Sequence, residues 1–373
     1  MEADSGGPGA PRVSALELRA FRNLELAALE LADGVTLLAG PNGAGKTNVL
    51  EGLYMSLAGR SPRTRSEREA IAFGAPAGRC EAVVTDGEER HLFRCAIVRA
   101  EGRFHQVDSR PAGPADAELR PAICVFMPDR LALIKGPPAA RRSHLDRFAA
   151  ALWPARAEIR RRYARALSQR NALLARAAGQ APPSLEAWDR ELAEAGVELI
   201  ALRAATVDLL IPRFAQAASE LGLSESAELD YRPRSSAREA EELVAELAER
   251  RGSDLGRGYS GHGPHLDELG FALGGRLARR YASQGQQRLS LLSLLFAERA
   301  VLTERRGRPP LMLLDDVTSE LDTERRGHLG ARLTADGGQS LITSTDSSDL
   351  PANVARTEIE VRDGALLGPG ARA

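Results

Sequence analysis

The sequence predicts an α/β fold assembled from both ends of the chain, with a helical arm inserted between them. Three observations support this prediction. A glycine-rich loop follows a buried strand near residue 40, an apolar strand ends in two acids at 315 and 316, and residues 138–222 are poor in turn residues and rich in Ala, Leu, Arg and Glu. We expect the following division: a disordered tail at 1–12, the α/β domain at 13–137 and 258–373, and the arm at 138–257.

The strands of the amino-terminal part are predicted from the alternation of apolar and polar side chains. Residues 13–39 alternate apolar and polar side chains and end in an apolar run, which is typical of strands leading into a buried one. Residues 79–108 predict short antiparallel strands around the Asp86-Gly87 turn.

The arm is predicted from helical spacing. A heptad seam is formed by Leu185, Trp188, Leu192, Ala195, Leu199, Leu202, Thr206 and Leu209. The preceding segment repeats that spacing and is broken only by Arg170, so the two segments are expected to pair as an antiparallel hairpin. Interruptions are expected at Pro154, at 179–184 and at Pro212. A third helix is expected at 235–251.

The carboxyl-terminal part returns to alternating strands and helices. The pattern predicts, in order, a strand at 271–275, a helix at about 284–304, a strand at 311–316, a helix at about 320–333 and a strand at 339–345.

Composition limits the function. The chain has 373 residues, 43% of them hydrophobic, and a formal net charge of −1, which excludes a globally basic DNA coat and a mainly disordered protein. It contains no apolar run of membrane-spanning length and no secretion-signal core, so we expect a cytoplasmic protein without a membrane partner. Cys80, Cys95 and Cys124 form no Cys-x-x-Cys pair, which argues against a disulfide framework and a zinc site.

A phosphate-binding loop is the most specific motif. It matches G-x-x-x-x-G-K-[ST] in full, with Gly40, Pro41, Asn42, Gly43, Ala44, Gly45, Lys46 and Thr47. The loop's N–H groups and the next helix's N-terminus favour a phosphate. Lys46 would reach the β- and γ-phosphates of ATP, and the Thr47 hydroxyl would ligate Mg²⁺. Lys occurs only at positions 46 and 135 of an Arg-rich chain, which favours a specific role for this one.

The second half of such a site should be a buried strand that ends in acids. Residues 311–316, LMLLDD, fit this description. Asp315 would complete the Mg²⁺ shell, and Asp316 would orient the attacking water, so Asp316 and Lys46 are the candidate catalytic residues.

A Ser-x-Gly-Gln element, Ser283, Gly285 and Gln286, precedes the helix expected at 284–304. Alone it is equally a capped helix start. In this order along the chain, the motifs resemble the ABC ATPase superfamily, in which the element contacts the γ-phosphate bound by the partner subunit. Ser319-Glu320-Leu321-Asp322 resembles the D-loop of that superfamily and also reads as a helix N-cap. For Thr343 and Thr345 two roles stay open: γ-phosphate sensing and simple strand ending.

Within that superfamily the chain resembles the RecF family over nearly its whole length. The resemblance rests on the phosphate loop, the acidic strand and the Ser-x-Gly-Gln element together with Leu18 to Asn23 and the segment from Pro128 to Asp146. It implies an ABC-type ATPase that is slow and DNA-stimulated, an ATP-dependent homodimer, and binding of gapped, single-stranded and duplex DNA in recombinational repair. It also implies RecR, RecO and RecA as partners, recombinase loading and induction of the SOS response.

Two positions depart from the family pattern. Leu266 stands where the family usually has an Arg, and Pro137 directly follows Gly136. Nearby, His262 and His265 have no third metal ligand at suitable spacing, so a metal site is not expected there.

DNA contacts must come from local basic surface because the total charge is near zero. The candidates are Arg141 and Arg142, through the family resemblance, and Arg160 and Arg161, in an Arg-rich stretch whose alternative interpretation is a solvated helix face. With 4% aromatic residues, base stacking is not expected to dominate.

Alternative functions follow from the same motifs. A transporter ATPase subunit would share the nucleotide motifs but lack the arm, and a non-hydrolysing ATP-binding scaffold would share the whole pattern. A nuclease-bearing relative would need a further acidic metal domain, and an SMC-type protein would need coiled coils of hundreds of residues.

Overall fold

The computed structural model describes residues 11–64, 66–177, 180–335 and 337–372. The chain divides into two compact units, which are treated separately below: unit 1 comprises the stretches up to Asp129 and from Leu302, and unit 2 comprises Arg130–Val301. The expected tail lies mostly outside the described residues, but Arg12 already belongs to the first strand, so the boundary at residue 12 was too late.

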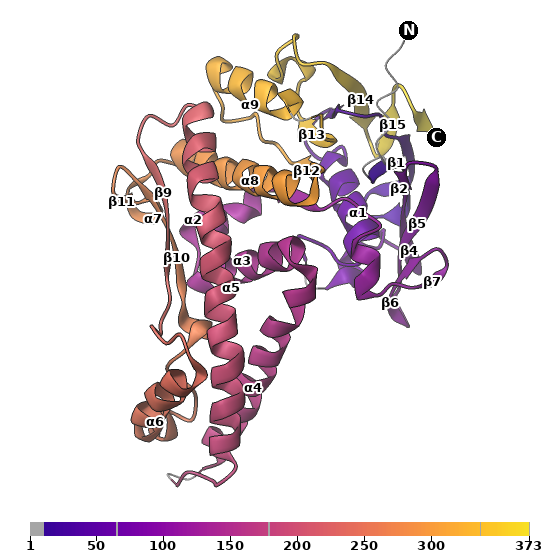
Figure 1. Cartoon of the computed structure of the whole chain (residues 1–373). Coiled ribbons are helices and arrows are strands. Elements are labelled where there is room, and N and C mark those ends of the chain that lie inside the picture. The colour runs from indigo at the N-terminus through magenta and orange to yellow at the C-terminus, as the bar shows by residue number, and fades with distance from the viewer. Residues whose placement is uncertain (1–10, 65, 178–179, 336, 373) are drawn as a thin grey trace. The chain divides into compact units, whose positions relative to one another are not determined.

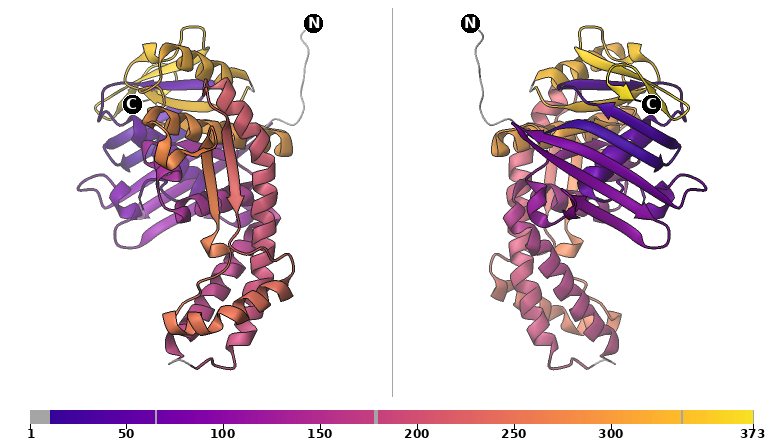
Figure 2. Two further views of the ribbon diagram at one scale, coloured as in Figure 1. Left: turned by 90° about the vertical axis from the view of Figure 1, so that its left-hand side faces the viewer. Right: turned by 90° about the vertical axis from the view of Figure 1, so that its right-hand side faces the viewer.

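Unit 1 contains an antiparallel sheet built mostly from the amino-terminal third of the chain. Its order is β16-β2-β1-β4-β5-β6-β7, and its strands are β1 Arg12–Phe21, β2 Leu24–Glu30, β4 Ala77–Asp86, β5 Glu89–Val98, β6 Gly102–Val107, β7 Arg110–Pro111 and β16 Ala371–Arg372. The indigo and purple strands lie side by side in Figure 2, right. The hairpin expected around Asp86-Gly87 is the β4–β5 connection.

The second sheet of unit 1 joins both ends of the chain. Its order is β15-β14-β3-β13-β12-β8, with only β15 antiparallel to its neighbour, and its strands are β3 Val35–Ala39, β8 Ile123–Phe126, β12 Leu311–Leu314, β13 Ser340–Ser344, β14 Arg356–Arg362 and β15 Ala365–Leu367. The run LMLL is buried throughout, as a parallel strand covered on both faces requires.

Helix α1, Lys46–Ala58, packs between the two sheets of unit 1 (Figure 1). The core around it takes Leu53 from the helix, Leu18 and Phe93 from the antiparallel sheet, and Leu313 and Ile359 from the parallel one. The remaining long helix of this unit is α9, Thr323–Ala335. This core therefore holds the start of α1 beside the carboxyl ends of β3, β12 and β13.

Unit 2 contains the helical arm. Its helices are α2 Ala132–Lys135, α3 Pro138–Leu152, α4 Ala157–Arg176, α5 Leu185–Glu220, α6 Ala240–Arg257, α7 Ala278–Tyr281 and α8 Gln284–Arg306, the last of which ends in unit 1. Helices α4 and α5 lie side by side (Figure 1), as the heptad seam predicts. A sheet of order β11-β10-β9 completes the unit, with β9 Ala227–Arg232, β10 Glu268–Leu273 and β11 Arg276–Leu277.

Two expectations about the arm were wrong in detail. Helix α5 continues through Pro212 to Glu220, because the burial of its apolar face on both sides of the proline outweighs one lost hydrogen bond. Arg170 does not break the seam: its side chain is 0% exposed, and its Nε and Nη1 donate to Asp189 (2.6 Å) and Asp254 (2.7 Å). The boundary between compact units also differs from the expected domain boundaries at 137 and 258, since β9, β10, β11 and most of α8 belong to unit 2.

Candidate nucleotide-binding site

The phosphate-binding loop connects β3 to α1, the strand–loop–helix order that its motif requires. A Cβ on Gly40 would lie 2.1 Å from the carbonyl oxygen of Val361, so only glycine fits there. Gly45, the residue before α1, has a φ of 114°, in the left-handed region that favours glycine. The loop conformation therefore depends on its glycines, as the motif predicts.

Lys46 is folded back onto this loop. Its Nζ donates to the carbonyl oxygens of Gly40 (2.6 Å) and Pro41 (2.9 Å), and the residue is 8% exposed. Burial lowers the pKa of Lys46, and the nearby charges of Asp316 and Asp315 oppose that shift. A buried ammonium held by two neutral carbonyls is well suited to exchange them for an anionic phosphate.

Thr47 and Asp315 lie together although 268 residues separate them in the sequence. The Thr47 hydroxyl donates to Asp315 at 2.8 and 3.0 Å. Burial raises the pKa of the Asp315 carboxyl, and hydrogen bonds from Thr343 and Thr47 oppose that rise. Hydroxyl and carboxylate oxygens are the ligands that Mg²⁺ prefers, so this pair fits the expected metal site.

Thr343, at the end of the neighbouring strand β13, supports both acids. Its hydroxyl donates to Asp315 (2.8 Å) and accepts the backbone N–H of Asp316 (2.9 Å). This contact gives Thr343 a definite place beside the acids, whereas Thr345 is exposed. Asp316 itself has a φ of 51°, a conformation that Asp tolerates better than most residues and that is enriched at functional sites.

A buried carboxylate behind the loop was missed by sequence reasoning. Glu51 of α1 is 0% exposed and accepts hydrogen bonds from Arg22 (2.8 and 3.0 Å), Ser61 (2.6 Å) and Arg63 (2.8 Å). Burial alone would raise the pKa of Glu51. The hydrogen bonds and charges of Arg22 and Arg63 outweigh this effect, so the pKa of Glu51 lies below its usual value. Arg63 also donates to Asn48 at 3.0 Å, so this cluster anchors the segment after α1 to the helix that begins at the loop. Its only sequence signal is a Glu on the buried face of α1.

The Ser-x-Gly-Gln element lies at the start of α8 in unit 2. The N–H of Ser283 donates to the Gln286 side chain (2.8 Å), and the N–H of Gln286 donates to the Ser283 hydroxyl (3.2 Å), which is a reciprocal helix cap. The Gln286 amide also donates to Glu225 at 3.0 and 3.1 Å. Both Ser283 and Gly285 reach the surface of the unit.

The stretch resembling a D-loop follows the acids in unit 1. The Ser319 hydroxyl donates to the carbonyl of Asp316 (3.2 Å), and Asp322 accepts the N–H of Arg325 (2.9 Å) at the start of α9. Asp322 therefore caps α9, which begins at Thr323 and not near residue 320 as expected, and this cap is compatible with the D-loop interpretation.

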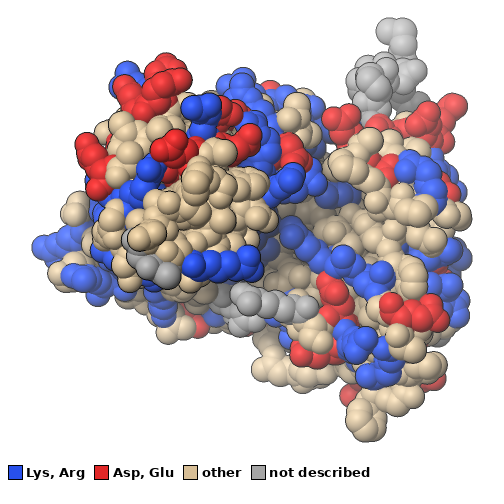
Figure 3. All heavy atoms as spheres, turned by 90° about the horizontal axis from the view of Figure 1, so that it is seen from below, with Lys and Arg blue, Asp and Glu red and all other residues tan. Residues whose placement is uncertain are grey.

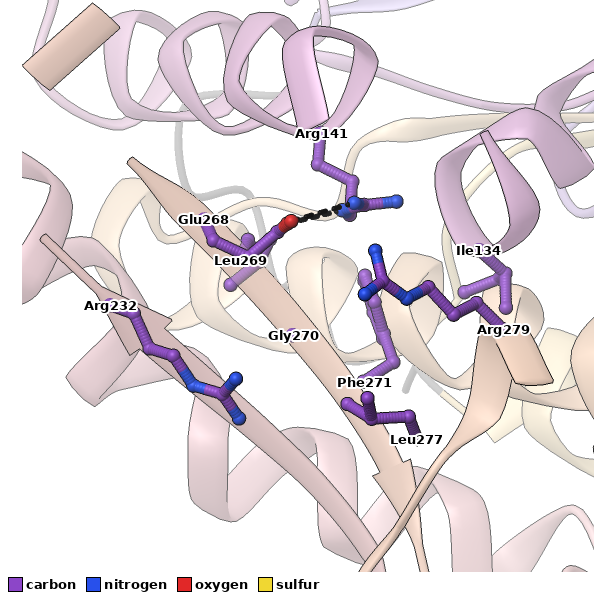
Figure 4. A pocket seen from close by; sticks show the side chains of 9 residues that line it. All are labelled: Ile134, Arg141, Arg232, Glu268, Leu269, Gly270, Phe271, Leu277 and Arg279. Atoms are coloured by element: carbon purple, nitrogen blue, oxygen red, sulfur yellow. Dashed lines mark hydrogen bonds and ion pairs between the residues drawn. The ribbon is translucent and has the colours of Figure 1, made fainter. Parts of the chain in front are cut away.

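Of the four candidate DNA-binding arginines, Arg141 is committed to the fold and Arg142 is partly engaged by it. Arg141 is 3% exposed; its guanidinium is paired with Glu268 (2.7 and 3.0 Å) and donates to the carbonyl of Gly136 (2.8 Å), as Figure 4 shows for the ion pair. Arg142 donates to the carbonyl of Asp267 (2.7 Å), and burial lowers its pKa. The structure thus argues against a DNA contact by Arg141, because its donors hold α3 against β10.

Arg160 and Arg161, by contrast, are exposed on α4. Arg160 lies 3.3 Å from Asp146, and Arg161 lies 2.5 Å from Glu158. On the face shown in Figure 3, Lys and Arg side chains alternate with Asp and Glu rather than forming one basic field, as the near-zero net charge leads us to expect.

The two candidate metal-ligating histidines serve structural contacts. His262 pairs with Glu246, and His265 contacts the hydroxyl of Tyr163 (2.7 Å) and the carbonyl of Ser260 (3.0 Å). Over the described ranges, no group of three or more His, Cys, Asp or Glu is arranged to hold a metal ion. The three cysteines are buried, and none of them forms a disulfide bond. Leu266 is an exposed apolar residue.

Comparison with known proteins identifies the family. Residues 15–109 match a family described as an AAA domain. A DNA replication and repair protein RecF from Anaeromyxobacter sp. (strain Fw109-5) is 38% identical over 370 residues, covering 96% of this chain and 99% of its own length. The chain belongs to the RecF family.

Solved structures agree with this assignment. A structure of the recombination mediator protein RecF-ATPrS in the RecFOR pathway superimposes with a TM-score of 0.85 at 27% identity, over 97% of this chain and 99% of that one. The Smc head domain from Pyrococcus furiosus, at 16% identity and a TM-score of 0.59 over 96% of both chains, shows the fold alone. The predicted fold, an ABC-type P-loop ATPase domain from both chain ends with an inserted helical arm, is confirmed.

RecF membership places the chain in DNA replication and repair. It also sets aside the transporter alternative, since the relative matches along nearly its whole length, including the arm. Within the described ranges, no helix combines the length and apolarity needed to cross a membrane.

Proposed function

We propose that this RecF-family chain is an ATP-switched DNA clamp: two copies close around two ATP molecules, bind DNA while closed, and separate after hydrolysis. The observation that carries the proposal is the hydrogen-bonded set Thr47, Asp315 and Thr343, which joins the phosphate loop to the acidic strand. The RecF-ATPrS structure that the chain resembles supports ATP as the nucleotide.

The residues divide the work as follows. Backbone N–H groups of residues 42–47 and the Lys46 ammonium would bind the phosphates, while Thr47 and Asp315 would hold Mg²⁺. The metal would neutralise charge on the phosphate oxygens. Asp316, adjacent to Asp315 and held by Thr343, would orient the attacking water.

The proposed dimer is argued from the number of motifs in each chain. Each chain has one phosphate loop and one Ser-x-Gly-Gln element, and in the ABC superfamily these face the same nucleotide from different subunits. Ser283, Gly285 and Gln286 would therefore contact the ATP of the partner, with Ser319 to Asp322 at the seam. Hydrolysis is expected to be slow, since Asp316 is one methylene shorter than the Glu that transporters of the superfamily carry at this position. Stimulation by DNA is expected from the family alone.

The biological setting rests on the family. We propose a cytoplasmic role in recombinational repair and replication restart at gapped or single-stranded regions, with RecR, RecO and RecA as partners and SOS induction as a consequence. Exposed cations such as Arg160 and Arg161 would bind the DNA backbone; Arg142, which retains partial exposure, would add to them.

Sedimentation with and without ATP and Mg²⁺ tests the clamp. We expect wild-type protein to dimerise with ATP, Lys46→Ala to remain monomeric because the phosphate loses its main counter-charge, and Asp316→Asn to prolong the dimer because hydrolysis slows. A wild-type monomer that persists at micromolar concentration under saturating ATP would refute the proposal.

Measuring phosphate release distinguishes the clamp from a non-hydrolysing ATP-binding scaffold. The clamp predicts slow release that DNA accelerates and that Asp316→Asn abolishes. A rate indistinguishable from that of Lys46→Ala, with and without DNA, would instead establish the scaffold.

A further inference from the structure

A groove runs between α4 and α5 on the arm. Its volume is about 430 Å³, within the range of about 300–1,000 Å³ typical of small-ligand sites. Helix α4 contributes Arg162, Arg165 and Ala166; helix α5 contributes Ala187, Trp188 and Glu191, and Ser184 lies just before it. None of these residues takes part in the nucleotide site, and all belong to unit 2.

The cations of the groove lie one helical turn apart on α4. Arg162 donates to both carboxylate oxygens of Glu198 (3.1 and 3.2 Å) in an exposed pair. Arg165 is exposed and has no acidic partner among the residues that the structure describes. The exposed pair is weak and solvent-screened, so both guanidinium groups are available to an anion.

Trp188 and Glu191 face these arginines from α5. The Trp188 ring packs against the arm core and keeps part of its surface exposed toward the groove. Glu191 is exposed one turn further along the helix and offers only acceptor oxygens. The groove thus combines an aromatic platform, a hydrogen-bond acceptor and cations.

This combination distinguishes among anionic ligands. A duplex backbone needs cations alone, and its bases are stacked and paired, which leaves no use for the indole or the carboxylate. An unpaired base can stack on an aromatic ring while its phosphates meet arginines, the mode by which single strands are bound. A carboxylate can also accept the exocyclic N–H of cytosine, which a duplex occupies by pairing.

We propose that this groove is a single-stranded DNA site in which one unpaired base stacks on Trp188, Glu191 accepts its amino group, and Arg165 and Arg162 bind the flanking phosphates. The proposal rests on the proposed DNA-binding function and gives it a place on the arm. It also assigns to one tryptophan the stacking role that the low aromatic content argues against for the chain as a whole.

Tryptophan fluorescence tests the stacking directly, since the chain has only two tryptophans, Trp153 and Trp188. In Trp153→Phe, a 15-nucleotide oligo(dC) without ATP should quench the remaining Trp188 emission saturably, and a 15-base-pair duplex should not. The matched variant Trp188→Phe, which reports Trp153 at the end of α3, should show no quenching. Absence of quenching in Trp153→Phe at any oligonucleotide concentration would overturn the proposal.

Affinity measurements test the other contacts by fluorescence anisotropy of labelled oligo(dC). Trp188→Ala should weaken binding about tenfold, within the usual range for one stacked base. Arg165→Ala should reduce the slope of log K against log salt by about 0.7, as expected for one phosphate contact on a single strand. Glu191→Ala should remove a preference of oligo(dC) over oligo(dT); an unchanged preference would refute the role of Glu191. Circular dichroism melting of each variant checks that the arm is folded.

The groove and the clamp fail in different ways. If Trp188→Ala and Arg165→Ala bind single strands like wild type while ATP still promotes dimerisation and duplex binding, the groove proposal is wrong and the proposed function stands. If the quenching occurs but ATP promotes neither dimer nor duplex binding, the groove holds and the clamp is wrong.

Discussion

Replacing Thr343 by Val should destabilise the acid pair without changing the shape of the side chain. Thr343 is fully buried, and its hydroxyl is both the donor to Asp315 and the acceptor for the N–H of Asp316. Val removes both bonds at once. The contrast with Thr345, an exposed threonine two residues later, makes the prediction specific.

The magnitude follows from the two contacts. A hydrogen bond to a charged group contributes about 1.5–3 kcal/mol, and an N–H left without an acceptor costs about 1–3 kcal/mol. Because Thr47 still donates to Asp315, we expect the free energy of unfolding of unit 1 to fall by about 3 kcal/mol, near the lower end of the sum. Thr343→Ser, which keeps the hydroxyl and loses one methyl, should cost only about 1 kcal/mol.

The same change has a signature in the pH dependence of metal binding. If Asp315 holds Mg²⁺ as proposed, the metal needs its ionised carboxylate, so metal-dependent stabilisation would be present above the pKa of Asp315 and lost as pH falls through it. Burial already raises this pKa, and the Thr343 hydrogen bond opposes the rise. As the pH is lowered, the increase in melting temperature caused by Mg²⁺ and ATP should therefore disappear at a higher pH in Thr343→Val than in wild type.

Urea unfolding and melting curves with and without Mg²⁺ and ATP, over a pH series, measure both effects. Thr345→Val serves as the surface control and should change stability by less than about 0.5 kcal/mol. If Thr343→Val unfolds at the same urea concentration as Thr343→Ser and its pH profile matches wild type, Thr343 does not hold the acids in the way the geometry indicates.

Two further substitutions probe buried charges. Arg170→Met should cost about 3–5 kcal/mol because it leaves Asp254 buried without its counter-charge and Asp189 with Arg251 as its remaining partner, and urea unfolding of the arm would show it. A variant as stable as wild type would mean that these ion pairs do not stabilise the arm. Glu51→Gln should weaken ATP binding, measured by calorimetry, because it releases Arg22 and Arg63 and loosens the segment after α1. Unchanged affinity together with unchanged stability would show that the Glu51 cluster does not support the loop.

The sequence was informative wherever a feature is local. The phosphate loop, the LMLLDD strand and the α4–α5 hairpin each depend on spacing within a few residues, and each lies where spacing predicts it. Even Thr47 and Asp315, 268 residues apart, could be paired because two local motifs with known partners specify them.

Features without a local signal could not be predicted. Arg170 looked like a defect in a heptad seam, since its partners Asp189 and Asp254 lie 19 and 84 residues away and nothing in the spacing connects them. Arg141 was a DNA-binding candidate through the family resemblance, and nothing in the local sequence connects it with its partner Glu268, 127 residues away. In both cases a buried counter-charge that arrives through the tertiary fold decides whether an arginine is structural or available to a ligand.

An acid within the same unit also affects how the Ser-x-Gly-Gln element would contact a partner's phosphate. Within its own unit the Ser283 hydroxyl accepts the N–H of Gln286, and this leaves its own O–H proton free to donate. The Gln286 amide, by contrast, is engaged by the Glu225 carboxylate. An arriving γ-phosphate could meet the Ser283 hydroxyl at once, but could meet Gln286 only after its amide leaves Glu225, an acid that repels the same phosphate. If the element contacts a partner's phosphate as proposed, breaking the Gln286–Glu225 contact would weaken its own binding, and the closed state would need further contacts across the proposed dimer interface.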